Sequence, residues 1–357
     1  MRLILWLVAV LMMAGCGGSV GVAPPRAAGM AATPLPGPSP YPGGSAIARL
    51  PDGSLLYSTG IVGPSMGEGA YPLRGNGTTL SLVQIGPDRI VACGRDSMRG
   101  RGLSEPVGRL TCKTVRDGVV ENSFQQGGFA RFLKPHDMLA DSSGIRVLAI
   151  RSNGVPTVIE ARRGGRSWAL DRIRRPVAGL LLPSNRAMVL YQTRAGCEWR
   201  HYRLADDGGV SLLSRRRETG RICGGFNSRT IRDVSTLEPY VLSVSNRQAE
   251  LTAVADDGTV STIPFAPKPL RIVPSYIAAV DGQLYFDDGS DPSFRRVIGA
   301  VNVADGSYRE IVLPDGEIYR RQRGLMADPA GGVWAMFLFD DWMTIRLATE
   351  SPAPGER

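Results

Sequence analysis

The sequence has little of what common cofactor and metal sites need. Its only histidines are His136 and His201, and no two of its five cysteines stand in a CxxC arrangement, which argues against a Cys/His zinc site. It contains no phosphate-binding loop of the Walker type and no dinucleotide-binding glycine pattern. After the first 15 residues, no apolar run is long enough to cross a membrane. Enzymes and transporters built on these elements are therefore not expected.

Lysine is scarce as well, because Lys113, Lys134 and Lys268 are the only lysines among 42 basic residues. Arginine therefore carries the formal net charge of +9. A basic balance can attract phosphates, acidic glycans or nucleic acid. The first residues of the chain indicate export, as described next, so nucleic acid is not an expected partner.

The first 15 residues have the layout of a secretory signal peptide. Arg2 supplies one positive charge, an apolar run follows from Leu3 to Met13, and the small residues Ala14 and Gly15 precede Cys16. The apolar run is too short to span a bilayer, which favours a cleaved signal over a membrane helix.

The segment from Met13 to Cys16 resembles the lipobox of bacterial lipoproteins, with Met where Leu is most usual. The resemblance implies that Cys16 becomes the lipidated first residue of the mature chain. Several acyl chains on one residue would hold the protein stably on a membrane. Gly17 follows the cysteine, which by resemblance to Gram-negative sorting implies the periplasmic face of the outer membrane. The alternative is an ordinary signal peptide that happens to contain a cysteine.

Residues 16–44 are rich in Gly, Ala, Pro and Ser and carry one charge, Arg26, so we expect a flexible tether there. Residues 45–357 remain as one domain. Four cysteines lie in it, and an even number in an oxidising compartment predicts two disulfides. We expect Cys93 to pair with Cys112 across a hairpin and Cys197 to pair with Cys223 between neighbouring loops.

Internal repetition is the most informative feature of this domain. Dipeptides that suit tight hairpin turns recur 41–50 residues apart, and a second series of turns interleaves with them. The first series is Asn76-Gly77, Asp117-Gly118, Gly164-Gly165, Asp207-Gly208, Asp257-Gly258 and Asp305-Gly306. The second includes Asp52-Gly53, Ser184-Asn185, Asp281-Gly282 and Gly331-Gly332. Each period therefore contains two hairpins, hence four strands.

Four antiparallel strands per period predict an all-β fold, a single β-propeller of seven four-stranded blades. The stretches Gly324 to Phe337 and Tyr276 to Phe286 resemble the repeats of NHL, SMP-30-like and streptogramin-lyase propellers. The alternative is a β-sandwich or two smaller β domains. The last blade lacks a fourth strand at the end of the chain, and we expect a segment near Ser39 to Ile47 to supply it, which would remove an exposed sheet edge.

Loops between the second and third strands of a blade, and between successive blades, share one face of such a ring. We refer to it as the loop-rich face and expect it to carry the ligand site. Arginine clusters predicted there are suited to capture of anions, because guanidinium binds phosphate and carboxylate in bidentate fashion. The candidates are Arg215, Arg216, Arg217, Arg320, Arg321 and Arg323. The alternative for these arginines is a solvated rim.

Aspartates follow the same strand in two adjacent predicted blades. Carboxylates so placed can bind a hard divalent cation such as Ca²⁺, the one cofactor that the sequence suggests. The candidates are Asp287, Asp288, Asp291, Asp340 and Asp341. The alternative is that these aspartates cap turns through neighbouring backbone amides.

Candidates for catalysis are weak. Gly63-Pro64-Ser65-Met66-Gly67 matches the GxSxG pattern, but no helical pattern follows it, as a nucleophile elbow requires. His136 or His201 could serve as a general base, although a structural histidine is commoner. We therefore expect a non-catalytic binding or scaffold module that recognises an envelope protein or an anionic envelope polymer. The alternative, which the resemblance implies, is a metal-dependent hydrolase or lyase of the SMP-30 or streptogramin-lyase kind.

Overall fold

In a computed structural model of the protein, the described residues form 27 β-strands and no α-helix. Among the described residues, no helix is long and apolar enough to span a bilayer. The residues described are 32–34, 46–49, 55–57, 60–62, 78–85, 89–98, 107–116, 119–125, 132–151, 153–171, 176–194, 196–218, 223, 227–245, 248–263, 276–288, 297–312, 322–328, 332–338 and 342–347.

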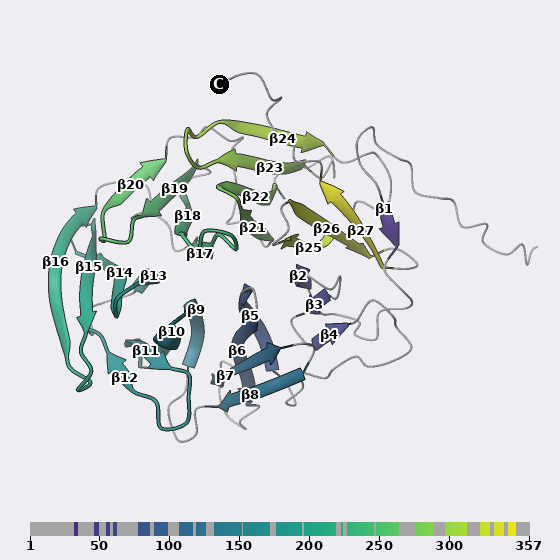
Figure 1. The fold of residues 1–357 in the computed structure, drawn as a ribbon. Coiled ribbons are helices and arrows are strands. Elements are labelled where there is room, and N and C mark those ends of the chain that lie inside the picture. Colours follow the sequence, from purple (N-terminus) through teal and green to yellow (C-terminus); the bar gives the residue numbers. More distant parts are fainter. Residues whose placement is uncertain are drawn as a thin grey trace, which may run out of the picture.

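Five groups of four consecutive strands each pair in antiparallel, up-and-down order to form a blade, and the blades stand around a common centre (Figure 1). The first blade consists of β5 (Thr78–Ile85), β6 (Ile90–Met98), β7 (Val107–Arg116) and β8 (Val119–Gln125). The second consists of β9 (Phe132–Asp141), β10 (Gly144–Arg151), β11 (Pro156–Glu160) and β12 (Ser167–Ala169).

The next three blades follow the same order from the centre to the rim. The third consists of β13 (Pro176–Leu182), β14 (Arg186–Thr193), β15 (Gly196–Leu204) and β16 (Val210–Glu218). The fourth consists of β17 (Asn227–Arg232), β18 (Pro239–Ser245), β19 (Gln248–Val254) and β20 (Val260–Ile263). The fifth consists of β21 (Ile277–Val280), β22 (Gln283–Asp288), β23 (Val297–Asn302) and β24 (Tyr308–Val312).

The remaining strands come from the two ends of the chain and form one seven-stranded sheet in the order β1-β27-β26-β25-β2-β3-β4. They are β1 (Ala32–Pro34), β2 (Ala46–Arg49), β3 (Leu55–Tyr57), β4 (Gly60–Val62), β25 (Gln322–Ala327), β26 (Val333–Leu338) and β27 (Trp342–Leu347). Strand β2 pairs in parallel with β25, and β1 pairs antiparallel with β27. The ring is therefore closed by pairing between the two ends of the chain.

The all-β fold and the single propeller are confirmed, but the prediction of seven four-stranded blades is wrong. The described residues form five, of which the first two are joined by one antiparallel pair, Gly108 on β7 with Phe132 on β9, and the chain ends share one larger sheet. The spacing of turn dipeptides predicts local hairpins. It does not predict pairing between strands that are far apart in the sequence, such as that of Ala48 with Ala327. The closing strand is also not the predicted Ser39 to Ile47 but Ala32–Pro34, which lies within the residues expected to form a tether. The predicted signal peptide, residues 1–15, lies outside the described residues.

The predicted turns form hairpins where the described chain contains them. Asp281 and Gly282 both have positive φ, of 51° and 70°, and Ser184 and Asn185 have φ of 58° and 54°. Two successive left-handed residues are the signature of a type I′ turn, whose twist matches that of the strands it joins. The local turn chemistry thus places the inner hairpins of the third and fifth blades.

The hydrophobic core lies between neighbouring blades. Leu181 on β13 packs with Leu148 and Tyr191 in a cluster shared by the second and third blades. Its neighbour Leu180 faces the other way and packs with Trp199 and other residues of a cluster shared with the fourth blade. Because successive strand residues point to opposite faces, each inner strand contributes to two inter-blade cores.

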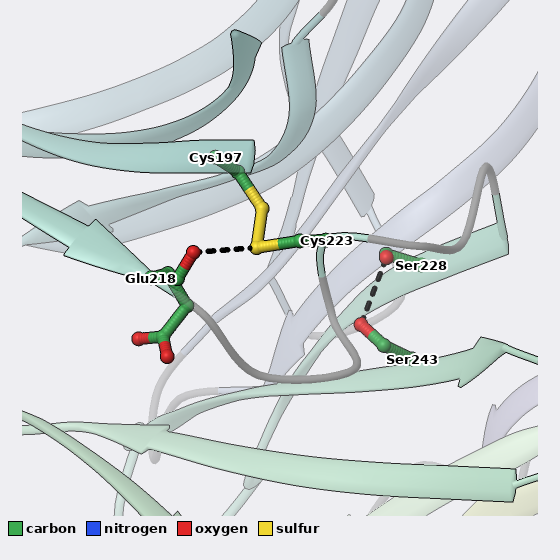
Figure 2. Close-up of a disulfide and its surroundings, with 5 residues drawn as sticks. All are labelled: Cys197, Glu218, Cys223, Ser228 and Ser243. Atoms are coloured by element: carbon green, nitrogen blue, oxygen red, sulfur yellow. Dashed lines mark hydrogen bonds between the residues drawn. A yellow bond between two sulfur atoms is a disulfide. The ribbon is translucent and has the colours of Figure 1, made fainter. Parts of the chain in front are cut away.

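Both predicted disulfides are confirmed. Cys93 on β6 and Cys112 on β7 are direct cross-strand partners with Cα atoms 4.1 Å apart. Cys197 on β15 is bonded to Cys223, in the segment after β16 (Figure 2). The loops closed by these bonds, with sequence separations of 19 and 26, should each stabilise the fold by about 3 kcal/mol in the chain-entropy model.

Candidate functional site

The inner strands of neighbouring blades are joined by buried and half-buried polar side chains. The side-chain amide of Gln84 on β5 donates to the carbonyl oxygen of Ala140 on β9 (2.6 Å) and accepts from the same residue's N–H (2.7 Å). The hydroxyl of Thr230 on β17 donates to the carbonyl of Gly179 on β13 (3.0 Å). These bonds satisfy backbone groups that would be costly to bury unpaired, and they connect strands of different blades.

Asp233, which is fully buried, makes the same kind of connection between the fourth and fifth blades. Its Oδ1 accepts the N–H groups of Ser235 (2.8 Å) and Thr236 (3.0 Å) in its own turn. Its Oδ2 accepts the N–H of Gly282 (2.9 Å), in the first hairpin of the fifth blade. One carboxylate therefore shapes a turn and fastens the next blade to it.

A further connection, which reaches three blades, is a buried ion pair between Asp137 on β9 and Arg232 on β17. Arg232 Nε donates to Asp137 Oδ1 (3.2 Å), and Arg232 Nη2 donates to Asp137 Oδ2. Between these strands in sequence lies β13, whose Leu181 donates its N–H to Asp137 Oδ2 (2.7 Å) and accepts from Arg232 Nη2 through its carbonyl (2.9 Å). One pair of side chains thus holds three successive blades together.

This ion pair lies on the wall of a cavity of about 120 Å³ bordered by inner strands of the ring. Arg229 and Thr230 also line the cavity. The Arg229 side chain is accessible to solvent yet closely surrounded by protein, and this desolvation lowers the pKa of its guanidinium. The rest of the wall is apolar and consists of Leu82, Val83, Met138, Ile231, Val234, Ile277, Ala278, Ala279 and Ala327. The centre of the ring therefore combines structural charges with apolar surface.

The predicted arginine cluster does not lie in a loop between blades. Arg215, Arg216 and Arg217 belong to β16, the outermost strand of the third blade, and all three are exposed. Arg216 Nη1 donates to the carbonyl of Val260 on β20 (2.7 Å). Arg323 lies on β25, and Arg320 and Arg321 lie outside the described residues. Whether these arginines bind an anion therefore stays a prediction.

Of the predicted cation ligands, Asp287 and Asp288 form the end of β22. Asp291, Asp340 and Asp341 lie outside the described residues, so the proposed juxtaposition of the two groups stays a prediction. In the described part of the chain, no three His, Cys, Asp or Glu side chains form a group that could hold a metal ion.

The two histidines lie in different blades. His136 is half-buried on β9, and His201 is buried on β15. The His201 ring packs against Gly258, where a Cβ atom would come within 2.6 Å of Nδ1, and Nε2 has no hydrogen-bond partner. Burial, with a contribution from the nearby Arg186, lowers the pKa of His201. These contacts fit a packed structural histidine. The GxSxG stretch, residues 63–67, lies outside the described residues.

Sequence reasoning missed the inter-blade residues Gln84, Asp137, Arg232 and Asp233. A signal was present for Asp137, which directly precedes the buried residues Met138, Leu139 and Ala140 of β9, whereas β17 is mostly polar and gives no such signal for Arg232 and Asp233. Buried Asp is rare unless paired, so a charge at position 137 predicts a partner in a neighbouring blade.

No protein-family model and no curated protein matches this sequence. Solved structures do match in fold. Virginiamycin B lyase from Staphylococcus aureus has a TM-score of 0.55 at 10% identity, with 89% of this chain and 99% of that chain covered. A catalytically inactive form of that lyase with quinupristin gives 0.56 at 11% identity, with the same coverage. The β-propeller domain of Cps50 (Swd1) from Myceliophteria thermophila gives 0.57 at 10% identity and covers 90% of this chain and 100% of that one.

At this identity the likeness establishes the fold alone. The resemblance to streptogramin-lyase propellers is therefore confirmed as a similarity of architecture, whereas the NHL and lipoprotein resemblances stay predictions. The lyase and the Cps50 domain match this chain about equally well. The comparisons consequently assign no activity to it.

A double-mutant cycle tests the ion pair. Asp137→Asn and Arg232→Met should each lower the free energy of unfolding by about 3–5 kcal/mol, because each leaves a buried group without its partner. The double variant should lose less free energy of unfolding than the two single variants lose together, since no uncompensated charge remains. Urea unfolding measures the free energy of unfolding of the three variants. The control is Asp206→Asn, which breaks the exposed 2.8 Å pair with Arg166 and should cost at most about 1 kcal/mol. Equal effects at the two sites would contradict the structural role.

The lowered pKa of His201 predicts a pH dependence of stability. In the unfolded chain His201 takes up a proton near its ordinary pKa of 6.5, whereas the folded protein resists protonation until a lower pH. Stability should therefore be full above pH 6.5 and fall as the pH drops from 6.5 toward the lowered native pKa. Between pH 7 and pH 5, the free energy of unfolding should depend less steeply on pH in His201→Leu than in the wild type. Arg186→Gln should reduce the same slope in part. Identical slopes for wild type and His201→Leu would refute the assignment.

Proposed function

We propose that this protein is a non-catalytic binding module of the cell envelope, held on a membrane by lipid on Cys16. The observation that supports the proposal is that the carboxylates near the centre of the ring are engaged in hydrogen bonds within the protein. The Asp137 carboxylate accepts from Leu181 and Arg232, and the Asp233 carboxylate accepts three backbone N–H groups. Groups engaged in this way hold the blades and are not poised for acid–base chemistry.

A ring with a fixed centre is well suited to binding through its outer surfaces. Its faces and rim present loops and edges on a rigid frame, and rigid frames reduce the ordering cost of association. Two disulfides join strands or segments of single blades, and such bonds persist in oxidising compartments. They support an exported location, for which we propose the periplasmic face of the outer membrane. The partner class that fits the basic charge is an envelope protein or an anionic envelope polymer.

The metal-dependent hydrolase or lyase stays a second candidate only through the fold it shares with virginiamycin B lyase. Metal analysis of the purified protein separates the two candidates. A stoichiometric divalent cation that is lost in Asp288→Asn would favour the enzyme, whereas metal-free protein that retains its partner supports the binding module.

Substitution of the proposed lipid attachment site tests the anchor. Cys16→Ser should abolish incorporation of a labelled fatty acid and move the protein from membrane to soluble fractions, because the thiol that accepts the lipid is gone. Cys223→Ser is the matched control: it breaks a disulfide and should leave labelling and membrane association unchanged. Membrane association of Cys16→Ser equal to that of wild type would contradict the anchor.

A further inference from the structure

Strand β16 differs from the other described outer strands. It is nine residues long, and every residue from Val210 to Arg217 is exposed. The outer strands β8, β12, β20 and β24 have seven, three, four and five residues, and β12 and β20 each contain buried positions. Figure 1 shows β16 as a long strand on the outside of the ring. The third blade thus extends beyond its neighbours.

The outer edge of β16 is open among the described residues. The strand is the last in the order β13-β14-β15-β16, and its one strand partner is β15. The open edge of a strand presents backbone N–H and C=O groups at alternate residues, which are a template for another extended chain. Stable proteins normally shorten, cover or twist away such an edge, or place charged side chains along it. The arginines stand on only one half of β16 and the other half is apolar, which points to use in recognition and not to protection alone.

Two different chemistries follow each other along this edge. Val210, Leu212 and Leu213 are 36%, 36% and 41% exposed, and they are the exposed large hydrophobic residues of the described chain. Arg215, Arg216 and Arg217 come next. An irregularity opposite His201 and Tyr202 leaves Leu213 without a register partner and separates the two halves. The edge therefore has an apolar half and a cationic half.

The arginines are not equivalent. The guanidinium of Arg216 is used within the protein, because it donates to the carbonyl of Val260 on the neighbouring blade. Arg215 lies opposite Arg200, and Arg217 lies opposite Glu198 on β15. Both are exposed and lie on the same face of the strand, so they can pair with carboxylates on an added chain.

Both ends of β16 are fixed before any partner arrives. At its start, Gly209 donates its N–H to Asp207 Oδ1 (2.8 Å), and its carbonyl accepts the N–H of Ala205 (2.9 Å). At its end, Glu218 is in register with Cys197, and a disulfide joins Cys197 to Cys223. Figure 2 shows Cys223 Sγ beside the Glu218 carbonyl oxygen, 3.0 Å away. A bonded sulfur carries no proton, so this is a close contact rather than a donated hydrogen bond. An edge fixed in this way loses little entropy on binding.

We propose that β16 is a docking edge for an extended segment of a protein partner that carries acidic residues followed by apolar residues. The segment adds to the sheet as an antiparallel strand, the arrangement of every other pair in this blade. Antiparallel order sets the N-terminal acidic residues of the partner beside Arg215 and Arg217. Its C-terminal apolar residues then lie beside Val210 and Leu212. The surface is independent of the lipid anchor and of the loop-rich face.

Charge complementarity distinguishes this partner from a second copy of the chain. Two copies of β16 paired antiparallel about Ser214 would place Leu212 and Leu213 against Arg216 and Arg215. They would also gather six guanidinium groups along one short edge. Like charges at this spacing repel, and the apolar side chains would face charged ones. An acidic and apolar segment satisfies both halves of the edge at once.

Fluorescence anisotropy of a labelled ten-residue peptide tests the proposal on the detergent-solubilised mature protein. The peptide has alternating glutamates in its N-terminal half and alternating valines in its C-terminal half. It should bind, and the affinity should fall as salt screens the charges. Reversing the order of the two halves should weaken binding at least tenfold. Methylation of alternate backbone nitrogens should abolish it in one of the two possible registers, because the added strand then lacks its donors.

Charge reversal identifies the arginines. The double substitution Arg215→Glu and Arg217→Glu should weaken binding at least tenfold and should bind a lysine version of the peptide in its place. Arg203→Glu, an exposed site on β15 of the same blade, is the matched control and should leave binding unchanged. Binding that is insensitive to N-methylation in both registers would overturn strand addition. A second result would also overturn the proposal: the wild-type protein binds no peptide, and the double variant Arg215→Gln, Arg217→Gln self-associates. The arginines would then only protect the edge from pairing. Peptide binding and self-association are both measured independently of membrane attachment.

Discussion

The buried ion pair between Asp137 and Arg232 is the contact on which the ring most depends. A propeller blade touches only its two neighbours, so most contacts join adjacent blades. This pair and the backbone of Leu181 instead bring three blades to one point near the centre. Taking both charges out of water is costly unless their hydrogen bonds are satisfied, and here backbone groups complete them. The pair therefore fixes the relative positions of the blades more than it adds to stability.

The other inter-blade bonds extend this arrangement around the centre. Gln84 joins the first blade to the second, Thr230 joins the fourth to the third, and Asp233 joins the fourth to the fifth. Each uses a side chain of, or just after, an innermost strand and a backbone group of its neighbour. In the function that we propose, partners are recognised by the faces and the rim, where β16 has an open edge among the described residues.

Much of the local structure could be predicted from the sequence, because turn chemistry and hairpin pairing are local. Ser184-Asn185 and Asp281-Gly282 form the tight turns that their composition favours, and Cys93 faces Cys112 across a hairpin. The number of blades could not be predicted in this way. It depends on pairing between Ala48 and Ala327 and between β1 and β27, contacts between opposite ends of the chain that leave no periodic trace. The place of the predicted arginines could not be predicted either. Three successive arginines suggested a loop, but Arg215, Arg216 and Arg217 pair with β15 as part of a strand. Their role in binding stays a prediction.

Native-state hydrogen exchange of the Leu181 amide tests most directly whether the three blades are held as one unit. Its N–H donates to Asp137 Oδ2, so it can exchange only when the contact opens. If the ion pair fixes the blades, this amide should exchange only through global unfolding, with a free energy equal to that from urea unfolding. Exchange through a local opening of much lower free energy, similar to that of amides on the exposed strand β16, would show that the blades separate independently and that the ring does not depend on this pair.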